Sequence, residues 1–206
     1  MKRNFDLASH PDVQLDEIAE SITSRDVIIA AVDFETNGLG SDNSVLSATA
    51  IRFSVEKQTV HLREIGRISR WYFPLENTNR TAIRVNRLTD SVIAKRRAGA
   101  SYPRHFQEDG KVASFIEECE IVVGHNIQFD LQFLPGLSEK PVFCTMRSNA
   151  TVLGLRRVDG TRRYPSLAAT ATHYGVPYSS GSLHDSRVDA ELTADIFRAM
   201  VLAKLR

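Results

Sequence analysis

The sequence predicts an α/β sandwich built on a mixed sheet. An unbroken apolar run over 27–32, rich in β-branched residues, is typical of a central strand buried on both faces. Two further strands joined by a short turn follow it, and after them short apolar strands alternate with helices. Elements in this order imply helices packed against a sheet with both parallel and antiparallel strand pairs.

The composition is that of an ordinary globular protein. The 206 residues suit one α/β domain with short extensions, and 42% are hydrophobic and 25% charged. The apolar runs are far shorter than the ~20 residues that cross a bilayer, and no secretory signal is recognisable. Cys119 and Cys144 lie in apolar surroundings without metal-binding spacing, as reduced core cysteines do. We therefore expect a cytoplasmic protein with no membrane partner.

We expect residues 1–25 to form a helical N-terminal extension and residues 26–206 to form one domain. In the extension, Leu15, Ile18 and Ile22 alternate with acidic residues. The residues after the first strand, 38–44, are Gly, Ser, Asn and Asp with one Leu, which predicts a turn. The expected elements after it are strands over 45–55 and 60–73, a loop over 75–84, helices over 85–94 and 105–118, a strand over 121–123, a helix over 126–134, a strand over 141–144, and helices over 146–155, 166–174 and 185–205.

Two acids, Asp33 and Glu35, stand at the end of the buried strand. Side chains alternate between the two faces of a strand, so both carboxylates point the same way. Two neighbouring carboxylates there are costly unless a positive charge lies between them. A divalent cation fits, because hard cations take oxygen ligands.

Two further acids interrupt apolar helix faces. In the helix that Asn126 is expected to cap, Asp130 shares a face with Ile127, Leu131 and Leu134. Such a carboxylate is rare unless it is paired or binds a metal. An acid favoured by the helix dipole is the alternative reading.

The last helix repeats this pattern. Asp189 shares a face with Leu192 and Ile196, and helix dipole or capping effects are again the alternative. His184 precedes Asp189 by five residues, so the two share a site only if His184 lies outside the helix. Asp185 or Ser186 as N-cap places it there.

Asp33, Glu35, Asp130 and Asp189 gathered in one place would repel one another strongly. Two divalent cations would neutralise them, and such a pair, ~3.5–4 Å apart, can clamp both oxygens of an in-line phosphoryl displacement. His184 then suits a general base that takes a proton from the attacking water.

Three segments together resemble the DnaQ-like (DEDDh) 3′–5′ exonucleases. They are VDFETNGL over 32–39, GHNIQFDLQFL over 124–134 and HDSRVDA over 184–190, in the order and spacing of that family. The resemblance covers about residues 26–204, so 26–206 is expected to be a DEDDh exonuclease domain. It implies a ribonuclease-H-like three-layer α/β/α sandwich with a five-stranded mixed sheet.

The resemblance also implies roles for single residues. Two divalent ions, Mg²⁺ or Mn²⁺, would be held with Asp33 bridging both, Glu35 and Asp189 completing the tighter site, and Asp130 holding the second. His184 would be the general base. The residues expected near the substrate are Thr36, Asn37, Gly38 and Leu39 at the 3′-terminal nucleotide, Leu39 as a wedge against its base, Asn126 as a support of the site, and Asn86 and Arg87 close to the terminal base.

Two compact basic clusters stand out although the net charge is only +1. They are 95–97 with Arg104, and 156–157 with 162–163. Charge runs are mostly solvated faces, and they gain weight only if the chemistry calls for a phosphodiester. The loop 95–105 is longer and more basic than the family leads us to expect. Its Tyr102 is a candidate stacking platform, and a plain surface loop is the alternative.

The function predicted is metal-dependent 3′–5′ hydrolysis of single-stranded nucleic acid to nucleoside 5′-monophosphates. DNA is favoured over RNA because the second motif looks more like that of proofreading members. An RNA-trimming exoribonuclease and a non-catalytic binding or polymerase-associated module are the alternatives. The expected partners are single-stranded 3′ ends. A polymerase or a replication or repair protein, and a homodimer, are open predictions.

Overall fold

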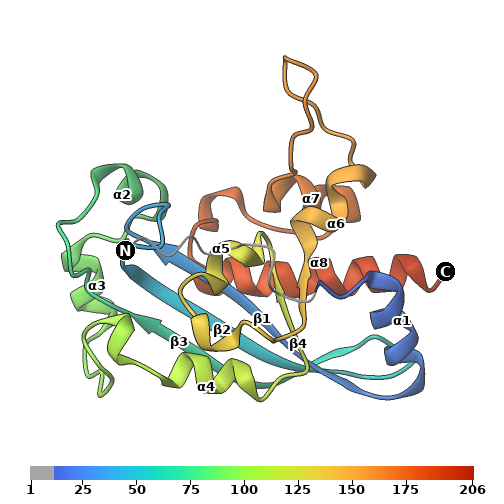
Figure 1. Ribbon diagram of the computed structural model, residues 1–206, viewed down its shortest axis with the longest axis horizontal. Coiled ribbons are helices and arrows are strands. Elements are labelled where there is room, and N and C mark those ends of the chain that lie inside the picture. The colour runs from blue at the N-terminus through green and yellow to red at the C-terminus, as the bar shows by residue number, and fades with distance from the viewer. Residues whose placement is uncertain (1–11) are drawn as a thin grey trace.

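The computed structural model describes residues 12–206, which form a five-stranded mixed sheet (Figure 1). The strand order is β3-β2-β1-β4-β5, with β1 antiparallel to β2 and parallel to β4. Strand β3 pairs antiparallel with β2, and β5 pairs parallel with β4. The strands are β1 (Val27–Thr36), β2 (Val45–Val55), β3 (Leu62–Trp71), β4 (Ile121–Gly124) and β5 (Val142–Cys144).

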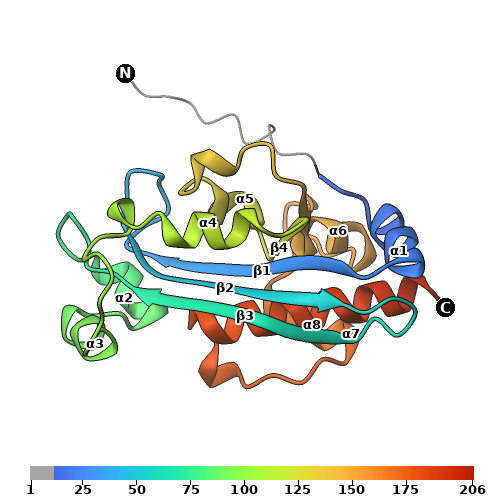
Figure 2. The same cartoon turned by 90° about the horizontal axis from the view of Figure 1, so that it is seen from below.

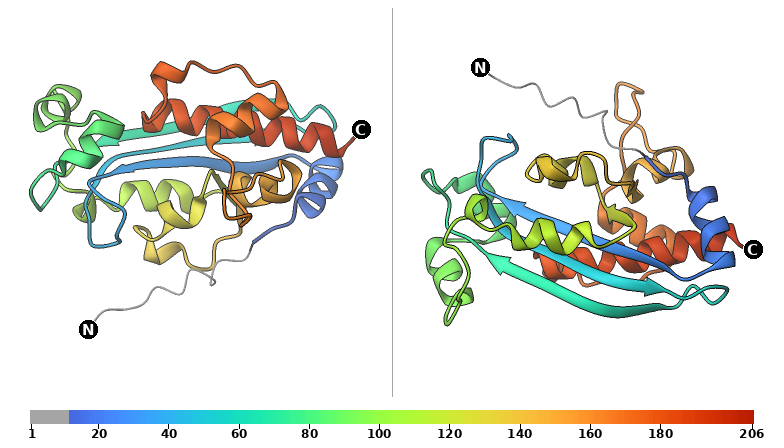
Figure 3. Two further views of the ribbon diagram at one scale, coloured as in Figure 1. Left: turned by 90° about the horizontal axis from the view of Figure 1, so that it is seen from above. Right: turned by 60° about the horizontal axis from the view of Figure 1, so that its bottom comes forward.

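Helices cover both faces of the sheet, which confirms the three-layer sandwich (Figures 2 and 3). On one face lie α1 (Leu15–Ser24), α7 (Leu167–Tyr174) and the long α8 (Ser186–Lys204). On the other lie α4 (Lys111–Glu117) and the short α5 (Ile127–Leu131). The remaining helices are α2 (Arg80–Asn86), α3 (Asp90–Arg96), α6 (Thr145–Val152) and the 3₁₀ turns Phe106–Glu108, Pro135–Leu137 and Ser180–Ser182.

Strand β1 is the centre of both apolar cores. Ile29 and Ala31 pack into the core beneath α8, whereas Ala30 and Val32 pack into the core beneath α4 and α5. All four are completely buried. The alternation explains why the apolar run has no polar break, since each face of the strand meets a layer of helices.

Helix α1 packs into the same core as α8. Its Ile18 and Ile22 are buried there, so residues 15–24 are part of the folded unit that the structure describes. The predicted extension also includes residues 1–11, which lie outside the described residues. The boundary at residue 25 stays a prediction.

The segment between β3 and α4 differs from the prediction. Residues 80–84 are helical, where a loop was expected over 75–84, because Asn79 caps α2 by accepting a hydrogen bond from Thr81 N at 2.9 Å. The expected helix over 85–94 is split in two, since Arg87 takes a left-handed conformation and Thr89 caps α3. The expected helix over 105–118 begins only at Lys111, because Asp109 turns inward to accept from Tyr72 Oη.

Within residues 12–206, no helix is both long and apolar enough to cross a membrane. Cys119 and Cys144 are free and buried, as expected. Burial raises the pKa of the Cys119 thiol to about 11, so the thiol stays protonated and unreactive.

Ile22→Ala tests whether α1 belongs to the domain. The side chain is fully buried against α8, so its truncation should lower the free energy of unfolding by about 2–5 kcal/mol. Chemical denaturation measures the change. Glu20→Ala, on the exposed face of the same helix, should shift it by no more than about 0.5 kcal/mol. Equal, small effects would mean that the helix is a dispensable extension.

Candidate active site

Asp33 and Glu35 occupy the carboxyl end of β1, as the alternation predicted. Phe34 between them points to the other face, where it packs on Phe106 with ring centroids 5.5 Å apart. In the register of the sheet, Asp33 lies opposite Thr49 and Glu35 opposite Ser47. A bulge follows directly between Glu35 and Thr36, so the regular ladder ends where the two acids stand.

Helix α5 brings Asp130 to the same place. Its buried carboxylate accepts a hydrogen bond from Phe34 N at 2.8 Å, which fixes it beside the backbone between Asp33 and Glu35. The strand-to-helix turn is tight, since a Cβ on Gly124 would lie 2.7 Å from Ile127 Cδ1. The buried acid therefore contacts the central strand directly, and its placement is not explained by the helix dipole alone.

Asn126 enters α5 in a left-handed conformation, with φ 74°. It occupies the predicted N-cap position, where its carbonyl accepts from Phe129 N at 2.8 Å, but its side chain makes no capping hydrogen bond to the helix. The short turn from Gly124 into α5 requires the unusual backbone, which Asn tolerates better than most residues. Asn126 thus supports the position of Asp130 through its backbone.

Helix α8 contributes Asp189 from its first turn, and His184 lies outside the helix as predicted. Asp185 is the N-cap, accepting from Arg187 N at 3.1 Å. Asp189 is buried, and its Oδ2 accepts from His184 N at 3.0 Å. The His184 side chain is exposed, and its backbone is left-handed with φ 64°.

Ser186, which sequence reasoning missed, connects α8 to the sheet. Its buried hydroxyl forms hydrogen bonds of 3.0 Å with both Ser47 Oγ and Thr49 Oγ1. These are the residues that pair with Glu35 and Asp33 in the sheet register. The contact fixes the start of α8 at the rungs that carry the two acids.

All four carboxyl groups have a raised pKa, and for Asp33 and Glu35 the neighbouring acids add to the effect of burial. Burial is the largest cause, and it raises the pKa of Glu35 and of Asp130 to about 8 and that of Asp189 to about 6. For Asp33, burial and then the charges of Asp130, Glu35 and Asp189 hold the pKa well above its usual range. Burial and crowding therefore favour the protonated carboxyl groups, and a bound cation would favour their charged forms.

The donor set fits a divalent metal. Ligand atoms of Glu35, His184 and Asp189 lie within 4.8 Å of one another. Asp189 Oδ1 is buried and, among residues 12–206, has no hydrogen-bond partner. An unpaired buried carboxylate oxygen beside further carboxylates is the arrangement that hard cations require.

Two of the residues predicted to contact the substrate, Leu39 and Asn37, differ in how far they are exposed. Leu39 is 88% exposed at the tip of the loop after β1, where it is free to contact a ligand. Asn37, in contrast, is 1% exposed, and its side chain is bonded to Glu76, to Asn77 O and to Asn79 N. Its amide therefore holds the segment 76–79, and a direct side-chain contact with substrate is not available to it.

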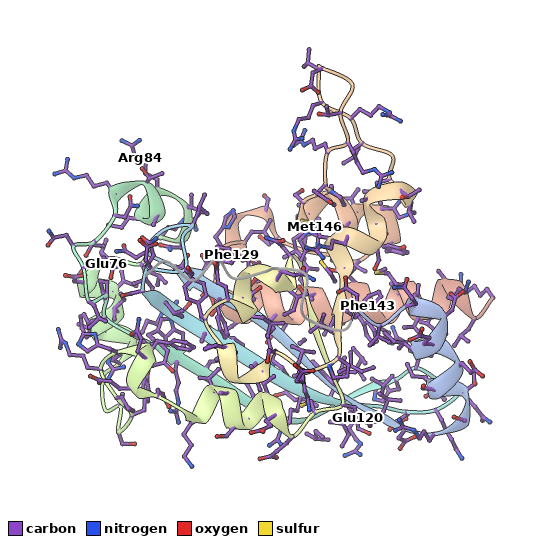
Figure 4. All side chains as sticks on the ribbon, in the orientation of Figure 1. Glu76, Arg84, Glu120, Phe129, Phe143 and Met146 are labelled. Carbon is purple, nitrogen blue, oxygen red and sulfur yellow. The ribbon has the colours of Figure 1, made fainter. Side chains whose placement is uncertain are left out.

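Glu76 is a second residue that sequence reasoning missed. It accepts hydrogen bonds from Asn37 Nδ2 at 2.7 Å, Ser44 N at 2.9 Å and Ser44 Oγ at 2.6 Å. Figure 4 shows it at the end of the molecule formed by α2 and α3. One carboxylate thus closes the loop 37–44 onto the start of α2.

Asn86 and Arg87 lie at the end of α2. Asn86 is buried, and its Nδ2 donates to Thr36 O at 3.1 Å. Arg87 Nη1 donates to Gly181 O at 3.0 Å, three residues before His184. A pocket of about 370 Å³ lies beside these residues, lined among others by Trp71, Asn86, Arg87, Arg96, His184 and Arg187. Both predicted residues therefore flank His184 and the end of β1.

Tyr102 of the basic loop is not free to stack on a base. Its ring contacts the guanidinium groups of Arg70 and Arg97, 4.7 and 4.4 Å from the ring centroid, and packs against Tyr72. Its hydroxyl accepts from Trp71 N at 3.0 Å. The side chain belongs to the core beneath α4, which favours the alternative of a surface loop anchored from inside.

The chain is similar in structure to solved exonucleases. "Exonuclease X in complex with 5′ overhanging duplex DNA" matches 86% of this chain and 93% of its own, with 16% identity and a TM-score of 0.56. A zinc-bound E. coli exonuclease I–single-stranded DNA complex matches 88% of this chain and 42% of its own, with 13% identity and a TM-score of 0.57. A full-length 3′-exonuclease matches 88% and 84%, with 13% identity and a TM-score of 0.60.

The chain shares the fold of these exonuclease structures. This confirms, at the level of fold, the resemblance found in the three motifs. The chain spans about two fifths of the length of the exonuclease I structures. No protein-family model and no curated protein matches the sequence. The exonuclease fold is therefore shown by structure, with the carboxylates at the end of its central strand.

The raised pKa values predict how stability depends on pH in metal-free buffer. Each carboxyl holds its proton more tightly in the folded chain than in the unfolded one. Its contribution is complete below the unfolded pKa, about 4, and is lost as pH rises through the folded values of about 6 to 8. The melting temperature in EDTA should therefore fall between pH 5 and pH 8.5.

Added Mg²⁺ should reverse this fall at pH 8.5. A concentration of 100 times Kd adds about 2.7 kcal/mol if only the folded state binds. Calorimetric scans of the protein and of Asp33→Asn measure both effects, and the variant should show a shallower fall because it carries one charge fewer. A melting temperature independent of pH and of Mg²⁺ would contradict a metal-binding carboxylate cluster.

Proposed function

We propose that the protein is a metal-dependent 3′–5′ exonuclease that hydrolyses single-stranded DNA to nucleoside 5′-monophosphates. The observation that carries the proposal is the meeting of four carboxyl groups from β1, α5 and α8. Ligand atoms of Glu35, Asp189 and the exposed His184 lie within 4.8 Å of one another, and Asp130 is bonded to Phe34 N beside Asp33. The similarity to exonuclease structures, two of them complexes with DNA, supports it.

The carboxylates would hold two divalent ions, Mg²⁺ or Mn²⁺. Asp33 would bridge both ions, Glu35 and Asp189 would complete the tighter site, and Asp130 would serve the second. When bound, the ions supply charge neutralisation for the phosphate and the leaving oxygen. The unpaired Asp189 Oδ1 and the crowding of Asp33 support this assignment.

His184 is the proposed general base. Its imidazole takes a proton from a water whose oxygen attacks the terminal phosphorus, and the 3′-oxygen of the preceding nucleotide leaves with the electron pair of the broken P–O bond. The exposed side chain can reach solvent, while the hydrogen bond from its backbone to Asp189 holds it next to the carboxylates.

The residues after β1 are proposed to receive the 3′-terminal nucleotide. The exposed Leu39 is placed to wedge against the terminal base, and Thr36 and Gly38 hold the loop through a 2.6 Å hydrogen bond from Thr36 Oγ1 to Gly38 O. Asn37 acts by holding the neighbouring segment 76–79. Asn86 and Arg87 lie close enough to contribute to the wall of the site.

DNA is the proposed substrate, and RNA trimming is the second candidate. The second motif and the DNA complexes among the similar structures favour DNA. A module that binds nucleic acid without cleaving it is less well supported, because all four carboxylates and the histidine are present. The predicted polymerase or repair partner and the homodimer would be tested by co-purification and by light scattering.

His184→Ala should slow turnover by about 10²–10⁴-fold, the usual contribution of a positioned general base. Single-turnover kinetics at saturating Mg²⁺ measures the loss. The affinity for Mg²⁺, measured by calorimetry, should change little because the carboxylates remain. His173→Ala, which changes an exposed histidine on α7, is the matched control. Unchanged turnover in His184→Ala would remove the residue from the mechanism.

The proposed activity is tested with single-stranded DNA and RNA of one sequence, labelled at the 5′ end. Each is incubated with Mg²⁺, Mn²⁺ or EDTA, using the natural protein and Asp33→Ala. A metal-dependent ladder that shortens from the 3′ end, is absent in the variant and forms faster on DNA is the expected result. A faster ladder on RNA would favour the exoribonuclease.

Asp33→Ala should also remain folded. Removing one charge relieves repulsion, and a gain of 1 kcal/mol raises the melting temperature by about 2–4 °C in a chain of this size. A marked drop in metal-free buffer would show instead that the lost activity reflects unfolding. Binding without any ladder would point to the non-catalytic module.

A further inference from the structure

A short β-hairpin between α6 and α7 projects away from the body of the protein (Figure 1). Its two arms, within residues 155–163, pair through Arg156 and Arg162 and through hydrogen bonds of 2.9 Å from Arg157 N to Thr161 O and from Arg163 N to Leu155 O. Gly160, with φ 81°, allows the tight turn, which a 3.0 Å bond to Arg157 O closes. We call residues 155–163 the arginine hairpin.

The arginine hairpin carries four positive charges and one negative charge. All four arginines, Arg156, Arg157, Arg162 and Arg163, are exposed. The one acid, Asp159, is occupied at the tip, where its Oδ1 accepts from Thr161 N and Oγ1. Four guanidinium groups on one small ribbon repel one another, and an anion that lies among them would relieve that repulsion.

The apolar residues of the hairpin are not buried, so the hairpin does not project in order to complete the core. Val158 at the tip is fully exposed, and Tyr164 beyond the second arm is half exposed. A two-stranded ribbon that buries little is only marginally stable in water. The hairpin therefore contributes little to the core, and what it presents to solvent is mainly basic.

The base of the hairpin is attached to the candidate active site. His125 Nε2 donates to Pro165 O at 3.1 Å, since a carbonyl can only accept, and Nδ1 then accepts from Thr145 Oγ1 at 2.9 Å. His125 precedes Asn126 and α5, the helix that carries Asp130. The hairpin is thus anchored to the turn that positions one of the four carboxylates.

A second group of exposed cations lies on the same edge of the protein as the hairpin. Arg80 and Arg84 project from α2, and Figure 4 shows Arg84 pointing outward on the edge from which the hairpin also rises. In the view of Figure 1, α2 and the hairpin both rise from the same edge of the protein. A strand that leaves the carboxylates along this edge would pass basic side chains on either side.

We propose that the arginine hairpin binds the phosphate backbone of the nucleic-acid strand, several nucleotides on the 5′ side of the bond that is cleaved. The inference rests on the proposed function. An arm of four residues is about 13 Å long at ~3.3 Å per residue, enough to meet more than one phosphate. Guanidinium groups match phosphate oxygens in pairs, and they read no base when they bind only the backbone. The hairpin would raise the affinity for long strands without selecting their sequence.

The test compares a 20-nucleotide DNA strand with a trinucleotide. The variant replaces all four hairpin arginines by Gln. Its KM for the 20-mer should rise by about tenfold or more, with kcat unchanged, whereas its KM for the trinucleotide should stay the same because so short a strand does not reach the hairpin. In anisotropy titrations of the 20-mer on an Asp33→Ala background, the slope of log K against log salt should become shallower by up to about 3 (~0.7 per lost phosphate contact).

Two further variants keep the test independent of folding and of total charge. Arg162→Gln with Arg163→Gln retains the hydrogen bonds that Arg156 and Arg157 donate within the hairpin, and should give an intermediate loss for the 20-mer. The control replaces Lys57, Arg63, Lys111 and Arg206, four exposed cations on other parts of the surface, by Gln. It should change the KM for the 20-mer by less than about twofold.

An equal change for both strand lengths, or an equal change in the control, would overturn the proposal. Its failure is distinct from failure of the proposed function. If the variant without the hairpin arginines shortens DNA equally well, the proposed function stands and the hairpin proposal fails. A protein that cleaves nothing, yet loses 20-mer binding only in the hairpin variants, keeps the hairpin site and loses the catalytic proposal. Absence of any nucleic-acid binding overturns both.

Discussion

Repulsion among four crowded carboxyl groups is the constraint on which the arrangement of this protein depends. Asp33 and Glu35 end the central strand, and the main chain and neighbouring helices hold the other two against them. Asp130 accepts from Phe34 N, and Asp189 accepts from His184 N. Because backbone donors fix both helical acids, their oxygens are held in place although burial raises the pKa of both and so disfavours their charged forms.

Each helix of the candidate site is entered through a residue in the left-handed region. Asn126 precedes α5, and His184 precedes the N-cap of α8. Such backbone conformations cost free energy in residues other than glycine and persist where surrounding contacts hold them. Around α5 the contacts are the close approach of Gly124 to Ile127, and around α8 they are the bonds from Ser186 to β2. Both abrupt turns let an acid in the first helical turn face the sheet.

The central parts of the fold could be predicted because they depend on local patterns. Alternation along β1 placed Asp33 and Glu35 on one face, and an acid on an apolar helix face identified Asp130 and Asp189. The errors arose where distant residues decide. Asp109 shortens α4 through Tyr72, 37 residues away in the sequence, and Glu76 holds Asn37 from a distance of 39 residues. No spacing rule reveals such contacts. The two alternatives for Tyr102 could not be separated for the same reason, since Arg70 and Trp71 of β3 hold its side chain.

The carboxylates and the loop after β1 are held by separate sets of contacts. Bonds among β1, β2, α5 and α8 hold the acids, whereas Glu76 ties the loop 37–44 to α2 and leaves Leu39 outside. The loop continues β1 directly, and the bond from Asn86 to Thr36 O adds a link from α2 to the end of that strand. Altering the loop, for instance by exchanging Leu39 or changing its length, should therefore leave the acids undisturbed. The loop and the carboxylates are therefore separate structural units. Variants of this chain can change which 3′-terminal nucleotides they accept and still keep the same catalytic residues.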